Sequence, residues 1–339
     1  MAIPINVRSP KIMTINGAVN TDTKIEIFLW QDPNSIPTIP TYTIEKRIVD
    51  ASVGNIYDIS PFAKTLIKHT AFNEVTSDEA MDEDSYCYCD LKLYENGAQI
   101  DVVNEFICFD GFGYHSEGAN PAHTKFLTDG SYYVNTVGNG GALSYYDDGA
   151  VLWTAQYTAL DGSFSTTITL SNEVGLIPYV NSLFSNGNKL EIFRDSVLQN
   201  TYTFIAQEEC KFTPINCDFI NKFGAWQRIV FFKASKSSFS VSSTEYNLMP
   251  SSANYNIQNN VRSAFNLNGK DKITVNTGWV FESYSDVIKQ LMLSEKILLD
   301  NEPVLISTKS IELQESINNN NINYKLDFEY SAPTLNYNL

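Results

Sequence analysis

The sequence has few histidines and few basic residues. Only 3 His occur in 339 residues, and 23 Lys and Arg are set against 39 Asp and Glu, so the formal net charge is −16 at pH 7. Nucleic-acid binding needs clustered Lys and Arg against the phosphates, and docking on an anionic membrane also needs a basic surface. The charge balance therefore disfavours both, and we expect no sequence-specific nucleic-acid binding.

Long apolar runs and nucleotide-binding motifs are absent as well. No run approaches the roughly 18 apolar residues of a membrane span, and the opening MAIPINVRSPKI lacks the basic segment and apolar block of a secretory signal. No GxGxxG or GxxxxGK[ST] motif stands between a strand and a helix. We expect a soluble protein made in a cytoplasm, with no membrane span and no cofactor.

Cysteines are few and odd in number: Cys87, Cys89, Cys108, Cys210 and Cys217. None belongs to a CxxC pair. Cys87 and Cys89 would share one face of a strand, which is poor geometry for a disulfide. We expect reduced, partly buried thiols and no disulfide.

What the sequence does have is aromatic residues and strand patterns. Aromatics make up 13%, with 19 Tyr and 20 Phe, and such rings suit the half-buried surface of a sheet. The length suggests two or three domains. We predict a mainly β protein of two or three β-sandwich-like domains over residues 1–118, 119–224 and 225–339. The third is a β-sandwich or α+β unit with one packed helix.

Individual elements follow from local patterns in the first two domains. Residues 24–30 and 86–94 alternate as strands, and Asn96-Gly97 after the second is a strong hairpin signal. The Pro-rich stretch 32–40 predicts a surface loop, and residues 60–67 a short helix with Ser60 as its N-cap. In the middle domain, strands are expected at 164–170, 189–193 and 201–205.

The C-terminal third combines predicted strands with a helix. Strands are expected at 225–233, 272–276, 278–281, 296–299, 304–308, 311–315 and 324–330. Residues 285–293 form the one convincing amphipathic helix, with an apolar stripe of Val287, Ile288, Leu291 and Met292. The consecutive asparagines 318–321 predict a loop tip.

A polar arm is predicted at about residues 235–260. Ser and Asn dominate this stretch, so it forms either a long extended hairpin or a disordered loop. It also holds spaced apolar residues: Phe239, Tyr246, Leu248, Met249 and Tyr255. Such anchors in a polar segment are what it needs to become ordered against a partner. We therefore expect the arm to act in assembly.

Patterns that suggest catalysis or metal binding are weak. His115, His123, Cys108 and Asp110 invite a zinc hypothesis, but their spacing fits no known ligand pattern. Cys108 with His115 or His69 lacks the motif of a nucleophilic pair. The acidic run 77–84 has neither the Gly nor the distal Glu of a calcium loop, and predicts a solvated loop. We predict no catalytic, cofactor-binding or metal-binding residues.

Two alternatives involve sugars. The Tyr-rich turns 131–133 and 144–148 would suit stacking on sugar rings, although burial in a thin core or an interface is the preferred interpretation. The many carboxylates leave a glycosidase pair open, since its spacing cannot be deduced from sequence. A carbohydrate-binding adhesin or receptor-binding tail protein, and a polysaccharide-degrading enzyme, therefore stay open beside a non-enzymatic role.

Several short sequence segments resemble structural tail proteins of bacteriophages that infect Bacteroidetes, including crAss-like phages. They are Val7-Arg8-Ser9-Pro10, Leu29-Trp30, residues 42–46, 57–62 and 219–227, and the closing stretches 278–284, 291–295 and 324–330. The resemblance implies a non-enzymatic virion component that forms an oligomeric ring or hub in the tail. It also implies self-association, neighbouring tail, ring or portal proteins as partners, and assembly in the host bacterial cytoplasm. The acidic composition fits a tail lumen that repels passing DNA.

Overall fold

The computed structural model describes residues 3–70, 72, 74–122, 125–128, 132–136, 140–147, 152–184, 186–206, 211–249, 258, 261–282, 284–312, 321–332 and 334. The fold is mainly β, which confirms the predicted class. The chain forms two compact units. Unit 1 comprises Met1–Glu208, Asp218–Ile229 and Leu293–Glu295, and unit 2 comprises Glu209–Cys217, Val230–Met292 and Lys296–Leu339. The domain boundaries near 118 and 224 stay a prediction.

The N-terminal part of unit 1 has two sheets. The larger sheet has the order β1-β8-β7-β3-β4, and β2 pairs with β5 in the smaller one. The bounds are β1 Ile3–Asn6, β2 Ile12–Ile15, β3 Asp22–Trp30, β4 Tyr42–Arg47, β5 Asn55–Asp58, β7 Tyr86–Glu95 and β8 Ala98–Phe109, with the helix α1 at Ser60–Lys64. Side chains from both sheets and from α1 share one apolar core. This is the layered, sandwich-like arrangement that was predicted.

Local turn chemistry sets the register of this sheet. Asn96 and Gly97 both have positive φ, as a two-residue hairpin turn requires, and they join β7 to β8. The alternating residues of β3 pair with β7 over eight positions. Ser60 departs from its predicted role. It lies inside α1, whose N-cap is Ile59, and its hydroxyl donates to the Ser9 carbonyl at 2.6 Å.

The middle part of unit 1 is a second sandwich. One sheet has the order β10-β13-β6 and the other β12-β11-β14-β15-β9. The bounds are β6 Glu79–Ala80, β9 Tyr132–Thr136, β10 Ala142–Tyr146, β11 Trp153–Ala159, β12 Ser165–Thr169, β13 Val174–Pro178, β14 Gly187–Arg194 and β15 Val197–Ala206. Rings and aliphatic side chains from both sheets fill a common core. The 3-10 turns η1 and η2 lie at Glu83–Ser85 and His115–Glu117.

The segment 219–227, which stood out in the sequence, is a turn built around Asn221. Its side-chain amide donates to the Leu127 carbonyl at 2.7 Å, and its Oδ1 accepts from the Phe223 N–H at 2.9 Å. Gly224 has φ of 79°, and a Cβ there would lie 2.4 Å from the Asp110 nitrogen. The turn therefore requires Asn221 for its hydrogen bonds and Gly224 because a larger residue would not fit.

A buried ion pair follows that turn. The guanidinium of Arg228 donates twice to the Asp218 carboxylate, at 2.6 and 2.9 Å, and also pairs with Glu74. Asp218 is fully buried and Arg228 nearly so. A buried pair of this kind compensates the cost of desolvating both charges only while both partners are present.

Unit 2 centres on a seven-stranded sheet with the order β17-β16-β20-β21-β22-β19-β18. The bounds are β16 Ile215–Ile220, β17 Trp226–Phe231, β18 Lys236–Asn247, β19 Arg262–Phe281, β20 Ile297–Leu299, β21 Glu302–Ile306 and β22 Asn321–Tyr330. The chain passes from one unit to the other within β16 and within β17. Predicted strand 311–315 is not confirmed: residues 311 and 312 are not in a strand, and residues 313–315 lie outside the described residues.

The predicted helix is α2, at Tyr284–Met292. Val287, Ile288 and Leu291 are buried as expected, and Met292 is half-buried. Lys289 is exposed on the other side of the helix. Ser283, the residue before this helix, lies outside the described residues. Within the part of the chain that the structure describes, no helix is both long and apolar enough to cross a bilayer.

Candidate functional site

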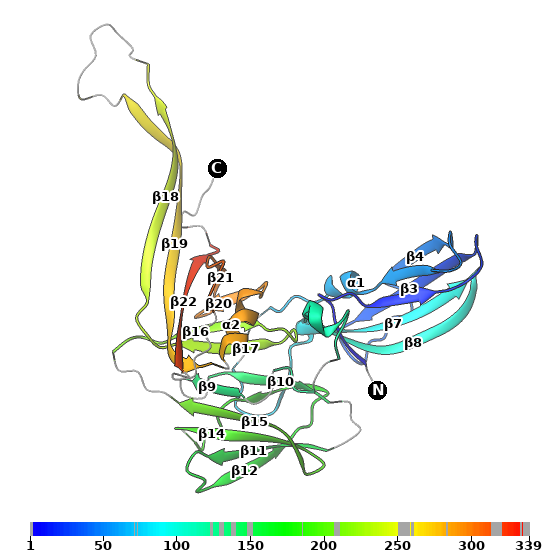
Figure 1. The fold of residues 1–339 in the computed structure, drawn as a ribbon, viewed down its shortest axis with the longest axis horizontal. Helices are drawn as coiled ribbons and strands as arrows, with labels where there is room; N and C mark the ends of the chain where they lie inside the picture. Colours follow the sequence, from blue (N-terminus) through cyan, green and yellow to red (C-terminus); the bar gives the residue numbers. More distant parts are fainter. Residues whose placement is uncertain are drawn as a thin grey trace. The chain divides into compact units, whose positions relative to one another are not determined.

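The most prominent feature of unit 2 is a two-stranded ribbon formed by β18 and β19, which we call the arm (Figure 1). The two strands pair antiparallel from Lys236 with Thr274 to Asn247 with Arg262. On its other side, β19 pairs with β22 only as far as Lys272. Beyond that residue the ribbon has no third strand among the described residues.

The arm is larger than the sequence indicated. The predicted segment 235–260 contains only the outgoing strand, whereas the return strand β19 begins at Arg262, ten residues before the predicted strand at 272. The hairpin alternative of the prediction is confirmed for the described residues. Residues 250–257 and 259–260, including Tyr255, lie outside them.

Apolar side chains lie exposed on both faces of the arm. Alternate residues of a strand point to opposite faces, and paired residues share a face. One face carries Phe239 and Val241, exposed by 57% and 58%, together with Leu267. The opposite face carries Tyr246 and Phe265, whose rings meet edge-to-face with centroids 5.6 Å apart.

A bulge separates these two apolar groups. Ser242 pairs with Asn268, and Thr244 pairs with Phe265, so β19 contains one extra residue at this point. Asn266 has φ of 53° in the left-handed region, which suits the bulge. Bulges twist a strand locally and protect an edge strand from uncontrolled pairing.

Charges are few on the arm and most of them are paired. Lys270 donates to Glu329 of β22 at 2.6 Å, and Lys272 lies 3.6 Å from the same carboxylate. The hydrogen bond from Lys270 lowers the pKa of Glu329 below its usual value. Further along the ribbon, Arg262 pairs with Glu245. The rest of the distal surface is apolar and neutral-polar.

The residues considered for zinc do not form a metal site in the described part of the chain. Cys108 is fully buried in β8, and burial together with the neighbouring Cys87 and Cys89 thiols raises its pKa. His115 lies in η2, and His123 is outside the described residues. No three His, Cys, Asp or Glu side chains gather there as a metal-binding group.

Asp110 instead lies beside a histidine and a lysine. Its carboxylate is 3.3 Å from Nε2 of His69 and 3.9 Å from the Lys64 ammonium, and both Asp110 and His69 are buried. The ring of His69 meets Trp226 edge-on, with centroids 6.1 Å apart. His69 was considered as a partner for Cys108, but the structure places its Nε2 against the carboxylate of Asp110.

The acidic run 77–84 is more structured than the predicted solvated loop. It contains β6 and the first part of η1, and Asp78 accepts hydrogen bonds from the Tyr145 hydroxyl at 2.5 Å and the Ser171 N–H at 2.9 Å. Tyr145 and Tyr146, from the Tyr-rich turn 144–148, are buried. Their rings belong to the core, as the preferred interpretation held. The side chains of Tyr132 and Tyr133 are not described.

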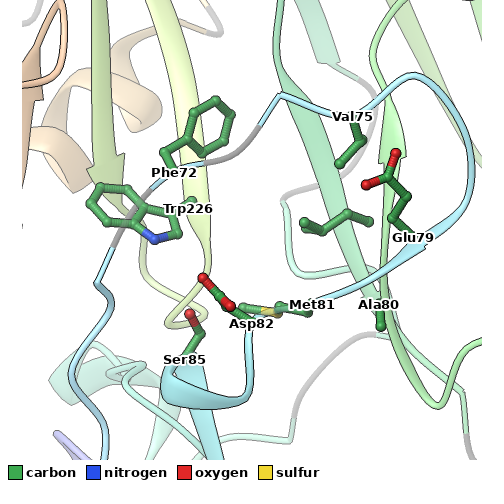
Figure 2. Close-up of a pocket in the computed structure, with 9 residues that line it drawn as sticks. Phe72, Val75, Glu79, Ala80, Met81, Asp82, Ser85 and Trp226 are labelled. Atoms are coloured by element: carbon green, nitrogen blue, oxygen red, sulfur yellow. The ribbon is translucent and has the colours of Figure 1, made fainter.

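Two concavities border this acidic run in unit 1. The smaller one is a cavity of about 60 Å³. Phe72 and Trp226 lie on one side of it and Val75 and Glu79 on the other, with Met81 and Asp82 below (Figure 2). Its volume is far below the roughly 300–1,000 Å³ of small-molecule sites. The cavity is therefore too small for an organic substrate.

The second concavity is an open groove of about 590 Å³. Acidic residues 82–84, Tyr86, Tyr88 and Glu173 line it. The Tyr88 hydroxyl donates to Glu173 at 2.9 Å, and burial raises the pKa of Tyr86 to about 12. Both tyrosines are buried, so their rings belong to the wall and offer little surface for stacking.

Comparisons with known proteins returned no match: no family model, no curated protein and no solved structure is similar to this chain.

Proposed function

We propose that this chain is a non-enzymatic structural protein of a bacteriophage tail, which self-associates into a ring or hub. The arm is the observation that carries the proposal. The resemblance of segments such as 7–10 and 219–227 to tail proteins of Bacteroidetes phages supports the same role. Neighbouring tail, ring or portal proteins are the further partners, and assembly takes place in the host bacterial cytoplasm.

The physical argument begins with the stability of the arm. A two-stranded hairpin is marginal in water, and a third strand or a packed face is needed to stabilise it. Every residue of β18 is exposed, although this edge strand is 12 residues long. Long exposed edge strands normally carry charges or proline against unwanted pairing. β18 has only Lys236, Glu245 and the neighbouring bulge in β19 as protection, so its exposure favours a function in binding.

The composition agrees with an assembled virion part. An acidic protein whose four described cysteines are buried, free thiols suits assembly in a reducing cytoplasm. Heterologous contacts between identical subunits close into rings when the rotation between neighbours allows it. An extended arm that reaches a neighbour provides such a contact.

Imaging of the purified full-length chain by negative-stain electron microscopy tests the proposal. Closed rings of uniform diameter are expected. A preparation that remains monomeric at all accessible concentrations, with the native fold verified by circular dichroism, would contradict a ring-forming role.

Carbohydrate binding and polysaccharide degradation remain the alternative predictions. The burial of Tyr145 and Tyr146 gives the first of them no support. Binding of the full-length chain on a glycan array would favour an adhesin or receptor-binding tail protein. Turnover that is lost on changing a single acidic pair would favour an enzyme.

A further inference from the structure

The dimensions of the arm indicate how much of it a partner must cover. The 12 residues of β18 span about 40 Å at roughly 3.3 Å per residue, and two strands are about 10 Å wide. Each face of the ribbon then offers on the order of 400 Å². A stable protein interface buries about 800 Å² on each partner. One covered face supplies half of that area, and two covered faces supply all of it.

The apolar side chains agree with cover on both sides. Phe239 and Val241 lie on one face, and Tyr246 and Phe265 lie on the other. An arm that lay flat on a surface would leave one of these groups in water. Aromatic residues are enriched among the residues that dominate interface energies. Their presence on both faces therefore favours an arm that inserts between two walls.

The net charge of the arm indicates which kind of surface covers its two faces. Residues 236–274 contain four basic and two acidic side chains, a net charge of +2, which leaves −18 on the rest of the chain. Glu329 reduces this excess of positive charge on the arm, because it pairs with Lys270 and Lys272. Two arms gain nothing from each other electrostatically, and two acidic bodies repel. An arm against an acidic body is the pairing that charge favours.

We propose that the arm of one copy inserts, with both faces covered, into the body of a second copy of this chain, where the body is the chain outside residues 236–274. The contact is one-way: each chain donates an arm and separately accepts one. This inference rests on the proposed self-association and adds to it the partner and the direction of the contact. A one-way contact is heterologous and so allows rings.

The test uses a full chain with a shortened arm. Replacing residues 240–270 by Asn-Gly leaves the existing pair of Phe239 and Asp271 closed by a two-residue turn. The shortened chain carries an affinity tag and is co-expressed with untagged wild-type chain. Because it keeps an accepting body, it is expected to retain wild-type chains. Expressed alone, it is expected to remain monomeric.

Two outcomes would overturn the inference in distinguishable ways. If tagged wild-type chain retains untagged wild-type chain but the shortened chain does not, the contact is arm to arm and only the inference fails. If tagged wild-type chain retains no untagged copies either, the self-association proposed above fails, and the inference fails with it. The second outcome also applies if the tagged wild-type chain retains another protein but no second copy of itself.

Paired substitutions test the two faces separately. Val241→Ser with Leu267→Ser changes one face, and Tyr246→Ser with Phe265→Ser changes the other. Each pair is made in the full-length chain that the tagged, shortened chain captures. Loss of two apolar groups from the contact should weaken this capture by about tenfold or more for either pair. Ile100→Ser in the same captured chain removes an exposed apolar residue from β8, outside the donated arm, and should leave capture by the shortened chain unchanged. If only one face matters, the arm is not inserted between two walls.

Discussion

The ring of Phe239 lies directly over Gly269 on the neighbouring strand, where a Cβ would come within 2.6 Å of its Cζ atom. Glycine at this position lets an exposed ring lie flat along the ribbon. Cross-strand packing of an aromatic residue over glycine also stabilises a strand that the glycine would otherwise weaken. The position of the Phe239 ring is therefore set within the single chain.

Substitution of this glycine tests that arrangement. Gly269→Ala forces the Phe239 ring off its position, so we expect weaker self-association, while the free energy of unfolding changes by no more than about 1 kcal/mol because the site is exposed. Sedimentation equilibrium and urea unfolding measure the two effects. Ser238→Ala, also exposed on β18, is the control. Equal self-association of all three chains would show that the position of the ring is irrelevant.

The packing of α2 gives a stability prediction. Leu291 is fully buried, so Leu291→Ala should lower the free energy of unfolding by about 2–5 kcal/mol. Lys289 is exposed on the same helix, and Lys289→Ala should stay within about 0.5 kcal/mol of wild type. Denaturant titrations of both variants provide the measurement. Similar losses from the two changes would mean that the helix packs through another face.

The buried pair of Arg228 and Asp218 predicts a non-additive result. Arg228→Met leaves the fully buried Asp218 carboxylate without its main partner, which should cost about 3–5 kcal/mol. Adding Asp218→Leu removes the stranded charge and should restore most of the loss. Urea midpoints of the two single variants and the double variant decide the matter. A double variant less stable than either single variant would contradict this account.

Buried tyrosines predict sensitivity to alkali. Burial raises the pKa of Tyr86 to about 12 and also raises the pKa of Tyr88, Tyr145, Tyr157 and Tyr179. Unfolded tyrosine ionises near pH 10. The buried, neutral tyrosines therefore contribute their full share to the free energy of unfolding below about pH 10. Above that pH their contribution falls, by up to about 1.4 kcal/mol per pH unit for each residue.

Denaturant midpoints measured from about pH 8 to pH 11 test this dependence. The midpoint should be level at first and then fall, and the ultraviolet signal of tyrosinate should appear in two stages, the second coinciding with unfolding. Tyrosines that all ionise near pH 10 in the native protein would refute the expected burial.

Local structure could be predicted from the sequence where a single short signal determines it. Asn96-Gly97 has few alternatives to a hairpin turn, and the stripe on α2 follows from one helical period. Asp78 was not readable in this way. Its partners Tyr145 and Ser171 are distant in the chain, so an acidic run looked like a solvated loop until the fold brought them together.

The return strand of the arm was missed for a different reason. A strand is recognised by the alternation of buried and exposed residues. Both faces of the arm are open, so β19 carries polar and apolar residues on each of them and shows no such period before residue 272. The bulge at Asn266 shifts the pattern by one more residue. A ribbon whose two faces are both exposed in the single chain shows little of its structure in the sequence pattern.

The size in solution of the wild-type chain and of the chain with residues 240–270 replaced by Asn-Gly tests the central claim most directly. Sedimentation velocity over a range of concentrations gives the mass of each. We expect discrete oligomers for wild type and a monomer with an otherwise unchanged circular dichroism spectrum for the shortened chain. Oligomers of the same size from both chains would contradict assembly through the arm.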